Sequence, residues 1–158
     1  MELYFRIANH SDIDVLMEAM RQFYAIDDYP FDEQTARVTL EKIVDDSSLG
    51  RVWLFQKEDE AIGYLVVTFG YSLEYLGRDA FIDEVFVKAA QRNQGVGTKA
   101  IQFALEACPA LGIHALHLEV ERTNVAGQKL YRKFGFEDHD RYLMTKKLIA
   151  IIHPRPSL

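Results

Sequence analysis

A glycine-containing turn in the middle of the chain has residue types and spacing suited to binding a phosphate. Arg92, Gly95 and Gly97 follow a β-prone run and open an amphipathic helix. Glycines let the backbone approach an anion closely, and the N–H groups at a helix start point toward it. The pattern predicts a phosphate-binding turn, with a plain glycine-capped loop as the alternative. The residues expected to contact phosphate are Arg92, Asn93, Gln94, Gly95, Val96, Gly97 and Thr98.

This turn matches neither of two common nucleotide-binding loops. Thr98-Lys99 after Gly97 reverses the Lys-Ser/Thr order of a nucleoside-triphosphate loop. Ala100 stands where a dinucleotide-binding turn has its third glycine. A different phosphate-containing ligand is therefore expected.

Two adjacent carboxylates, Asp83 and Glu84, interrupt the apolar run that precedes the turn. Successive residues of a strand point to opposite faces, so only one of the two is expected to face a given cleft. By this alternation Asp83 shares a face with Val85 and Val87. Either carboxylate is a candidate general base, and a salt bridge at the sheet surface is the alternative for both.

The composition of the chain argues against several classes of protein. The 158 residues predict a single domain, and 24 acidic against 18 basic residues argue against nucleic-acid binding through a basic face. Cys108 alone excludes an intrachain disulfide, and His114, His117 and His139 lack the spacing of metal ligands, so no metal is expected. There is no apolar run of roughly 18 residues, and residues 1–6 lack the features of a secretion signal, so a cytoplasmic protein without a membrane span is expected.

The order of expected elements predicts a mixed α/β fold, in which helices flank a mostly antiparallel sheet with a central βαβ unit. One domain is expected over residues 1–150, with a frayed tail over residues 151–158. Residues 70–79 are expected to form a loop. The expected strands cover residues 3–8, 52–55, 61–69, 80–87 and 115–120, with a closing pair at 135–136 and 142–145. Helices are expected near residues 13–24 and 32–44, and another is expected to run through residues 130–131. A further helix is expected to open at the segment 91–98 and to be ended by Pro109 and Gly112.

A second motif, about 30 residues after the turn, carries a family resemblance. This motif and the turn of Arg92, Gly95 and Gly97 together resemble the two motifs of the GNAT superfamily of acyl-CoA-dependent N-acetyltransferases. The resemblance covers roughly residues 50–148. The second motif is matched by Asn124, Leu130, Tyr131, Gly135 and Phe136. One departure is Gly127, which stands where the family has a small alanine and slightly weakens the helix.

The resemblance implies acetyl-CoA as co-substrate and direct attack of an amine on the thioester. It implies that backbone N–H groups of Val85 or Val87 bind the carbonyl oxygen, while pantetheine pairs along Val85, Phe86 and Val87. It further implies that Tyr131 protonates the leaving thiolate, a core aromatic being the alternative. Asn124 and Gly127 are implied to contact the cofactor, and a helix N-cap is the alternative for Asn124. Asp83 matches the acidic position that polyamine-acetylating relatives use as the general base. Glu84 or a chain of water molecules is the alternative base.

In the family, the acceptor site lies between the first two helices, before the central strand and after the next strand. Acidic residues interleaved with tyrosines would suit a small cationic amine there, and solvated acidic loops are the alternative. The length of the 70–79 loop favours a small amine over a peptide. A protein N-acetyltransferase and a non-catalytic acyl-CoA sensor are the other functions left open, and a homodimer is possible. The acceptor residues implied are Asp28, Tyr29, Tyr71, Glu74 and Glu119.

Overall fold

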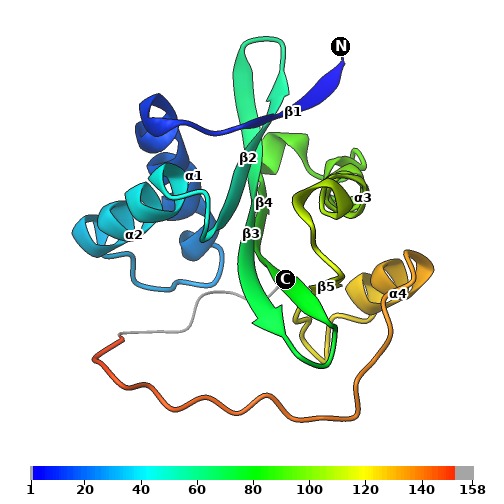
Figure 1. The fold of residues 1–158 in the computed structure, drawn as a ribbon. Helices are drawn as coiled ribbons and strands as arrows, with labels where there is room; N and C mark the ends of the chain where they lie inside the picture. The colour runs from blue at the N-terminus through cyan, green and yellow to red at the C-terminus, as the bar shows by residue number, and fades with distance from the viewer. Residues whose placement is uncertain (1, 152–158) are drawn as a thin grey trace.

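A five-stranded sheet separates two helical layers in the computed structural model, which describes residues 2–151 (Figure 1). The strand order is β1-β2-β3-β4-β5, antiparallel except for the parallel pair β4 and β5. The predicted mixed fold with a central βαβ unit is confirmed. The strands are β1 Leu3–Ile7, β2 Gly50–Lys57, β3 Glu60–Ser72, β4 Gly77–Val87 and β5 Ala115–His117.

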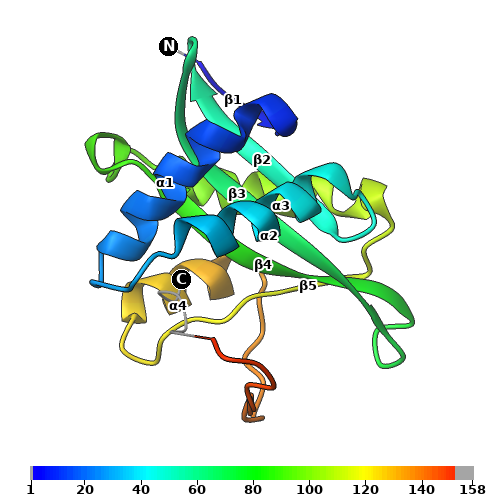
Figure 2. The same ribbon diagram turned by 90° about the vertical axis from the view of Figure 1, so that its left-hand side faces the viewer.

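Helices cover both faces of the sheet. The pair α1 (Ile13–Ala25) and α2 (Glu33–Asp45) lies on one face and stands in front of the sheet in Figure 2. The helices α3 (Val96–Ala107) and α4 (Val125–Lys133) lie on the other side. Three short 3-10 helices are η1 His10–Asp12, η2 Ala89–Gln91 and η3 Pro109–Leu111.

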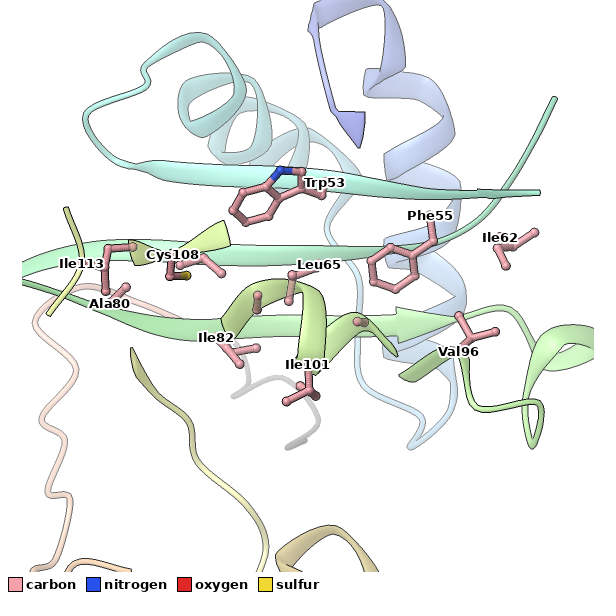
Figure 3. Close-up of a cluster of buried hydrophobic side chains, with 13 residues drawn as sticks. Trp53, Phe55, Ile62, Leu65, Ala80, Ile82, Val96, Ile101, Cys108 and Ile113 are labelled. Carbon is pink, nitrogen blue, oxygen red and sulfur yellow. The ribbon is translucent and has the colours of Figure 1, made fainter. Parts of the chain in front are cut away.

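Each face of the sheet has its own apolar core. Phe55, Leu65 and Ile82 pack with Ile101 of α3 in the cluster of Figure 3. On the opposite face, sheet residues such as Leu54 pack with α1 and α2 in a second cluster. Fully burying one aliphatic side chain contributes about 1.5–3 kcal/mol. The two cores therefore hold the sheet rigidly between the helices.

The central strand β4 contains a β-bulge at Asp83. Val66 pairs with Glu84 and Val67 with Ile82, so Asp83 is the extra residue of the bulge on β4. Simple alternation would place Ile82 and Glu84 on one face. Instead, Ile82 lies in the α3-side core, while the strand partner of Glu84 lies in the α1–α2 core. The alternation used to group Asp83 with Val85 and Val87 therefore does not hold across the bulge.

Three sequence-based predictions of local structure were wrong. Residues 70–79 are largely strand, because β3 runs to Ser72 and β4 begins at Gly77, so the loop length gives no support to a small acceptor. The strand expected at 115–120 ends at His117. The closing pair at 135–136 and 142–145 is absent from the described residues, because these β-prone stretches have no strand beside them to pair with. Of the expected frayed tail, residues 152–158 lie outside the described part.

Among residues 2–151, no helix has both the length and the apolar character that crossing a membrane requires.

Candidate active site

The sheet opens between β4 and β5. Their parallel ladder ends where Phe81 pairs with His117, whereas β4 continues to Val87. Among the described residues, the edge of β4 from Ile82 to Val87 has no neighbouring strand on that side. Such an edge presents backbone N–H and C=O groups to an incoming extended ligand. The three residues expected to pair with pantetheine, Val85, Phe86 and Val87, lie on this open stretch.

The glycine turn follows directly at the end of this edge. Asn93 and Gly95 have positive φ angles of 59° and 75°, which place the chain at the start of α3. Gly95 is the N-cap residue, no side chain caps the helix, and the first helical bond runs from Lys99 N–H to Gly95 O. The first N–H groups of α3 therefore face outward with the positive end of the helix dipole.

Space is left open where an anion would lie. A Cβ built on either Gly95 or Gly97 meets no atom within 4 Å. The side chain of Val96 points the other way into the core, so only its backbone can reach a ligand. An open helix start of this kind has room for an anion and N–H groups to bind it, so the phosphate-binding role of the turn stays a prediction.

Positive charge lies next to the turn. Arg92 is exposed, and its Nε donates to Val87 O at 2.9 Å, which links the turn to the end of β4. Lys57 of β2 donates through Nζ to the side-chain oxygens of Gln91 and Gln94, at 2.8 and 3.1 Å. Sequence reasoning missed Lys57, because it is more than 30 positions away and only the folding of β2 beside the turn reveals it.

A buried carboxylate lies on the α1–α2 side of β4. Glu84 is only 5% exposed, and it accepts hydrogen bonds from Tyr64 Oη at 2.8 Å and Tyr24 Oη at 3.0 Å. Asp83 beside it is half-buried. The two phenols fix the carboxylate of Glu84, since a buried charge requires hydrogen-bond donors.

Sequence reasoning missed the two tyrosines. Tyr24 fits the apolar spacing of its helix, and Tyr64 fits the β-prone run of its strand. The available signal was the acid itself, because a carboxylate on a buried strand must find donors nearby.

The second motif forms the start and body of α4. Asn124 is the N-cap, and its Oδ1 accepts from the Gly127 N–H at 2.9 Å, so the alternative role as a helix cap is confirmed. A Cβ on Gly127 would lie 2.5 Å from Asn124 Nδ2, so a larger residue would require the end of the Asn124 side chain to move.

Tyr131 lies on the same helix and is half-buried. Its ring packs edge-on against Phe136, with centroids 6.1 Å apart, and no described residue hydrogen-bonds to its hydroxyl. Burial raises the pKa of Tyr131 above its ordinary value. The phenol is therefore protonated at neutral pH and has a hydroxyl to donate.

The structure brings only part of the expected acceptor residues together. Asp28 and Tyr29 follow α1, and the Tyr29 N–H donates to the carbonyl of Tyr24, the tyrosine that contacts Glu84. Tyr71, by contrast, pairs with Arg78 near the β3–β4 tip. The tip lies about five strand residues, roughly 16 Å, from the bulge.

Two further acceptor residues lie away from Glu84. Glu74 at the tip accepts two hydrogen bonds from Arg141, at 2.9 and 3.0 Å, which lower the pKa of Glu74. Glu119 is exposed in the segment after β5.

The cysteine and the histidines have structural surroundings. Cys108 is buried in the α3-side core, and desolvation raises its pKa to about 11, so the thiol packs and is not a nucleophile. His117 lies 3.0 Å from Asp79 through Nε2. Within residues 2–151, no group of three His, Cys, Asp or Glu side chains has the arrangement of metal ligands.

The acetyltransferase (GNAT) family model matches residues 14–136, which is more than half of the chain. The protein therefore belongs to this family of acetyltransferases. The match includes the open edge of β4, the glycine turn and the whole of α4.

Two relatives show limited similarity in sequence. A thialysine N-epsilon-acetyltransferase from Bos taurus is 32% identical over 77 residues, which are 49% of this chain and 45% of that protein. An L-methionine sulfoximine/L-methionine sulfone acetyltransferase from Pseudomonas paraeruginosa is 36% identical over 53 residues, or 34% of this chain and 31% of that protein. The chain thus spans less than half the length of these two relatives.

Solved structures share the fold over nearly the whole chain. An integron cassette protein, HFX_CASS3, from the mobile metagenome of Cole Harbour Salt Marsh has a TM-score of 0.83 at 32% identity, covering 94% of this chain and 92% of that one. AAC(6')-Iy in complex with a bisubstrate analog, CoA-S-monomethyl-acetylneamine, has a TM-score of 0.76 at 18% identity, covering 94% and 100%. At 18% identity the likeness establishes the fold alone.

Proposed function

We propose that this protein is an N-acetyltransferase that moves the acetyl group of acetyl-CoA to a primary amine of a small, cationic substrate. One observation carries the proposal: the uncapped start of α3 follows directly on the open edge of β4. A diphosphate at the helix start would leave an attached pantetheine arm free to pair along that edge. Membership of the acetyltransferase family supports the same chemistry.

The residues of the turn fit the coenzyme. Backbone N–H groups from Asn93 to Thr98 would hold the diphosphate, with Arg92 adding positive charge. The edge from Val85 to Val87 would pair with pantetheine, and the start of α4 at Asn124 and Gly127 would contact the same arm. Bound acetyl-CoA supplies an acetyl group activated as a thioester.

Charge that develops during transfer needs fixed donors. An N–H of Val85 or Val87, on the open edge, would donate to the carbonyl oxygen as it becomes negative. Tyr131 would give its proton to the departing thiolate, because its phenol is protonated and has no hydrogen bond to a described residue.

The attacking amine must lose a proton, and Glu84 is the acceptor that we assign first. Its carboxylate is held by Tyr24 and Tyr64, and Tyr24 connects it to the end of α1, where Asp28 and Tyr29 lie. Asp83 is the second candidate, because it lies beside Glu84 at the bulge, on the stretch of β4 that borders the opening.

A cationic acceptor is proposed from charge and from the relatives. The chain has a net charge of −6, and acidic residues follow both α1 and β5, which would attract a positive substrate. Two relatives are named for acetylating thialysine and L-methionine sulfoximine. Asp28, Tyr29 and Glu119 would contact the amine, whereas Tyr71 and Glu74 at the hairpin tip would reach only a long acceptor such as a polyamine.

Two measurements, made one after the other, test the proposal. Acetyl-CoA and CoA should raise the melting temperature, whereas ATP and NAD should not. Thiol release from acetyl-CoA is then followed with a panel of polyamines, amino acids, aminoglycosides and a lysine peptide. If acetyl-CoA binds but none of the amines causes thiol release, the protein is better explained as an acyl-CoA sensor. If only the lysine peptide causes thiol release, a protein acetyltransferase is favoured. Absence of CoA binding would end the proposal.

A further inference from the structure

The last residue of β2, Lys57, contacts the segment that leads into α3. Its Nζ donates to Gln91 Oε1 at 2.8 Å and to Gln94 Oε1 at 3.1 Å. The two glutamines lie on either side of Arg92 and Asn93 in the chain, so one ammonium group holds both ends of this part of the turn. We call the three residues Lys57, Gln91 and Gln94 the clamp.

Both glutamines are also tied to the backbone before the turn. Gln94 Nε2 donates to Ala90 O at 3.2 Å, which leaves the Oε1 of the same amide turned toward Lys57. Gln91 is the last residue of η2, and its N–H donates to Lys88 O at 2.9 Å. The clamp therefore connects β2 to the backbone of residues 88–94 as well as to two side chains.

The strand that carries the lysine is fixed relative to α3. Phe55, two residues before Lys57, is 0% exposed, as is Ile62 on β3, and Val96 in the first turn of α3 is 3% exposed. All three belong to the α3-side core, and Figure 3 shows them at the same end of that cluster. Because a core of this kind is close-packed, the end of β2 keeps its place beside the start of α3.

The turn contains a conformation that needs support. Asn93 has a φ of 59°, in the left-handed region that is unfavourable for a residue with a side chain. Such a residue persists only where its surroundings hold it. The clamp supplies that support, because it holds the residues on both sides of the pair Arg92 and Asn93.

The clamp keeps the positive charge of Lys57 next to the start of α3. Its ammonium group donates to two neutral amides, which orient it without cancelling its charge. Glu60 of the adjoining hairpin instead pairs with Lys88, at 3.0 Å. The charge of Lys57 therefore adds to the positive end of the helix dipole.

We propose that Lys57 is a positioning residue for the coenzyme: through Gln91 and Gln94 it holds the turn in the conformation that receives the diphosphate. The inference rests on the proposed binding of acetyl-CoA at this turn. A preorganised site binds more tightly, because less conformational entropy is lost on binding. Loss of the clamp should therefore weaken binding of the coenzyme and leave the chemistry at the thioester unchanged.

Calorimetry with CoA compares two lysine variants. Lys57→Met removes the clamp, and Lys88→Met is the matched control, because it removes the same charge beside the same turn but pairs with Glu60. CoA should bind Lys57→Met about five- to tenfold more weakly, with a similar rise in KM for acetyl-CoA and little change in kcat. The control should bind CoA as the wild type does. Equal losses in both variants would show an effect of charge alone and would refute the clamp.

A second set of variants separates positioning from direct contact with the phosphates. Gln91→Leu and Gln94→Leu together remove the acceptors of the clamp and should weaken CoA binding as much as Lys57→Met does. Adding Lys57→Met to that pair should weaken binding no further, because residues that act as one unit are not additive. Fully additive losses would show that Lys57 acts on the coenzyme without the glutamines and would overturn the proposal.

Hydrogen exchange tests the clamp without any coenzyme. The N–H groups of Gln91, Arg92 and Lys99, which donate to backbone carbonyls, should exchange faster in Lys57→Met than in the wild type or Lys88→Met. Unchanged exchange would refute the clamp. If the wild type binds no CoA, the proposed function fails and this inference fails with it. If the wild type binds CoA and Lys57→Met binds it equally tightly, the proposed function stands and only the clamp is refuted.

Discussion

The hydroxyl of Tyr24 in α1 donates to Oε2 of Glu84 in β4 at 3.0 Å, although 60 positions separate the two residues. This contact joins the N-terminal helices to the carboxylate next to the open edge of the sheet. It makes the end of α1 part of the candidate site rather than a separate structural layer.

We expect Glu84→Gln to lower kcat/KM by about a hundredfold or more, because the amide keeps the shape but cannot accept the amine's proton. The acidic limb of the pH profile of kcat/KM should disappear with it. Asp83→Asn is the matched variant and should retain both rate and profile. If Asp83→Asn lost the acidic limb instead, the base would be Asp83.

Tyr131→Phe should lower kcat by roughly ten- to a thousandfold with little change in affinity for acetyl-CoA. The change removes only a hydroxyl that has no hydrogen bond to a described residue, so the fold should be unaffected. Steady-state kinetics and calorimetry of CoA binding separate the two effects. An unchanged kcat would remove Tyr131 from the mechanism.

A pair of glycines tests the phosphate turn. Gly95 and Gly112 have φ angles of 75° and 74°, and an added Cβ meets nothing within 4 Å at either position. Alanine should therefore strain both positions equally and cost about 1 kcal/mol of stability in each. Only Gly95→Ala should also weaken CoA binding, as measured by calorimetry.

Gly97→Ala sharpens this comparison. Gly97 is helical, so alanine should stabilise α3 slightly while filling the space proposed for the diphosphate. A variant that is more stable but binds CoA more weakly is the expected result. Unchanged affinity in both Gly95→Ala and Gly97→Ala would place the phosphates elsewhere.

Stability should depend on Asp12 in a pH-dependent way. Hydrogen bonds from Arg6 at 2.7 and 2.8 Å, and one from the Asn9 N–H, hold the pKa of Asp12 below its ordinary value. A lowered folded-state pKa contributes stability above the unfolded pKa, near 3.9, and the contribution is lost as pH falls through the folded value.

Asp12→Asn should therefore cost about 2 kcal/mol at pH 7, and the difference from the wild type should shrink toward pH 2. Urea unfolding at a series of pH values measures this. Asp14→Asn is the control, since the pair of Asp14 with Arg37 is exposed and should contribute less than about 0.5 kcal/mol. Equal costs for both variants would contradict the assignment.

Local chemistry made most of the fold predictable. Pro30 separates the first two helices, and Asp32 begins the second by accepting from the Gln34 and Thr35 N–H groups. The glycine turn was likewise recognisable, because its geometry depends on neighbours in sequence. Element type follows from short-range propensity and periodicity in such segments.

What could not be predicted depends on distant partners. Tyr64 and Lys57 acquire their roles only when β2, β3 and β4 are side by side. The bulge at Asp83 is a property of pairing with β3 and is invisible in β4 alone. The prediction of strands near residues 135 and 142 was wrong for the same reason, because a strand requires a neighbouring strand to pair with as well as suitable residues.

The extra residue at Asp83 divides β4 into two halves that serve opposite layers. Side chains before it anchor α3, and the same alternation after it delivers Glu84 to the helices on the other side. Deleting this one position would rotate the whole second half by one register step, removing the carboxylate from its phenols while leaving the composition almost unchanged. Homologous chains can therefore be divided into those that have this extra bulge residue in the strand equivalent to β4 and those that lack it, before any comparison of catalytic side chains.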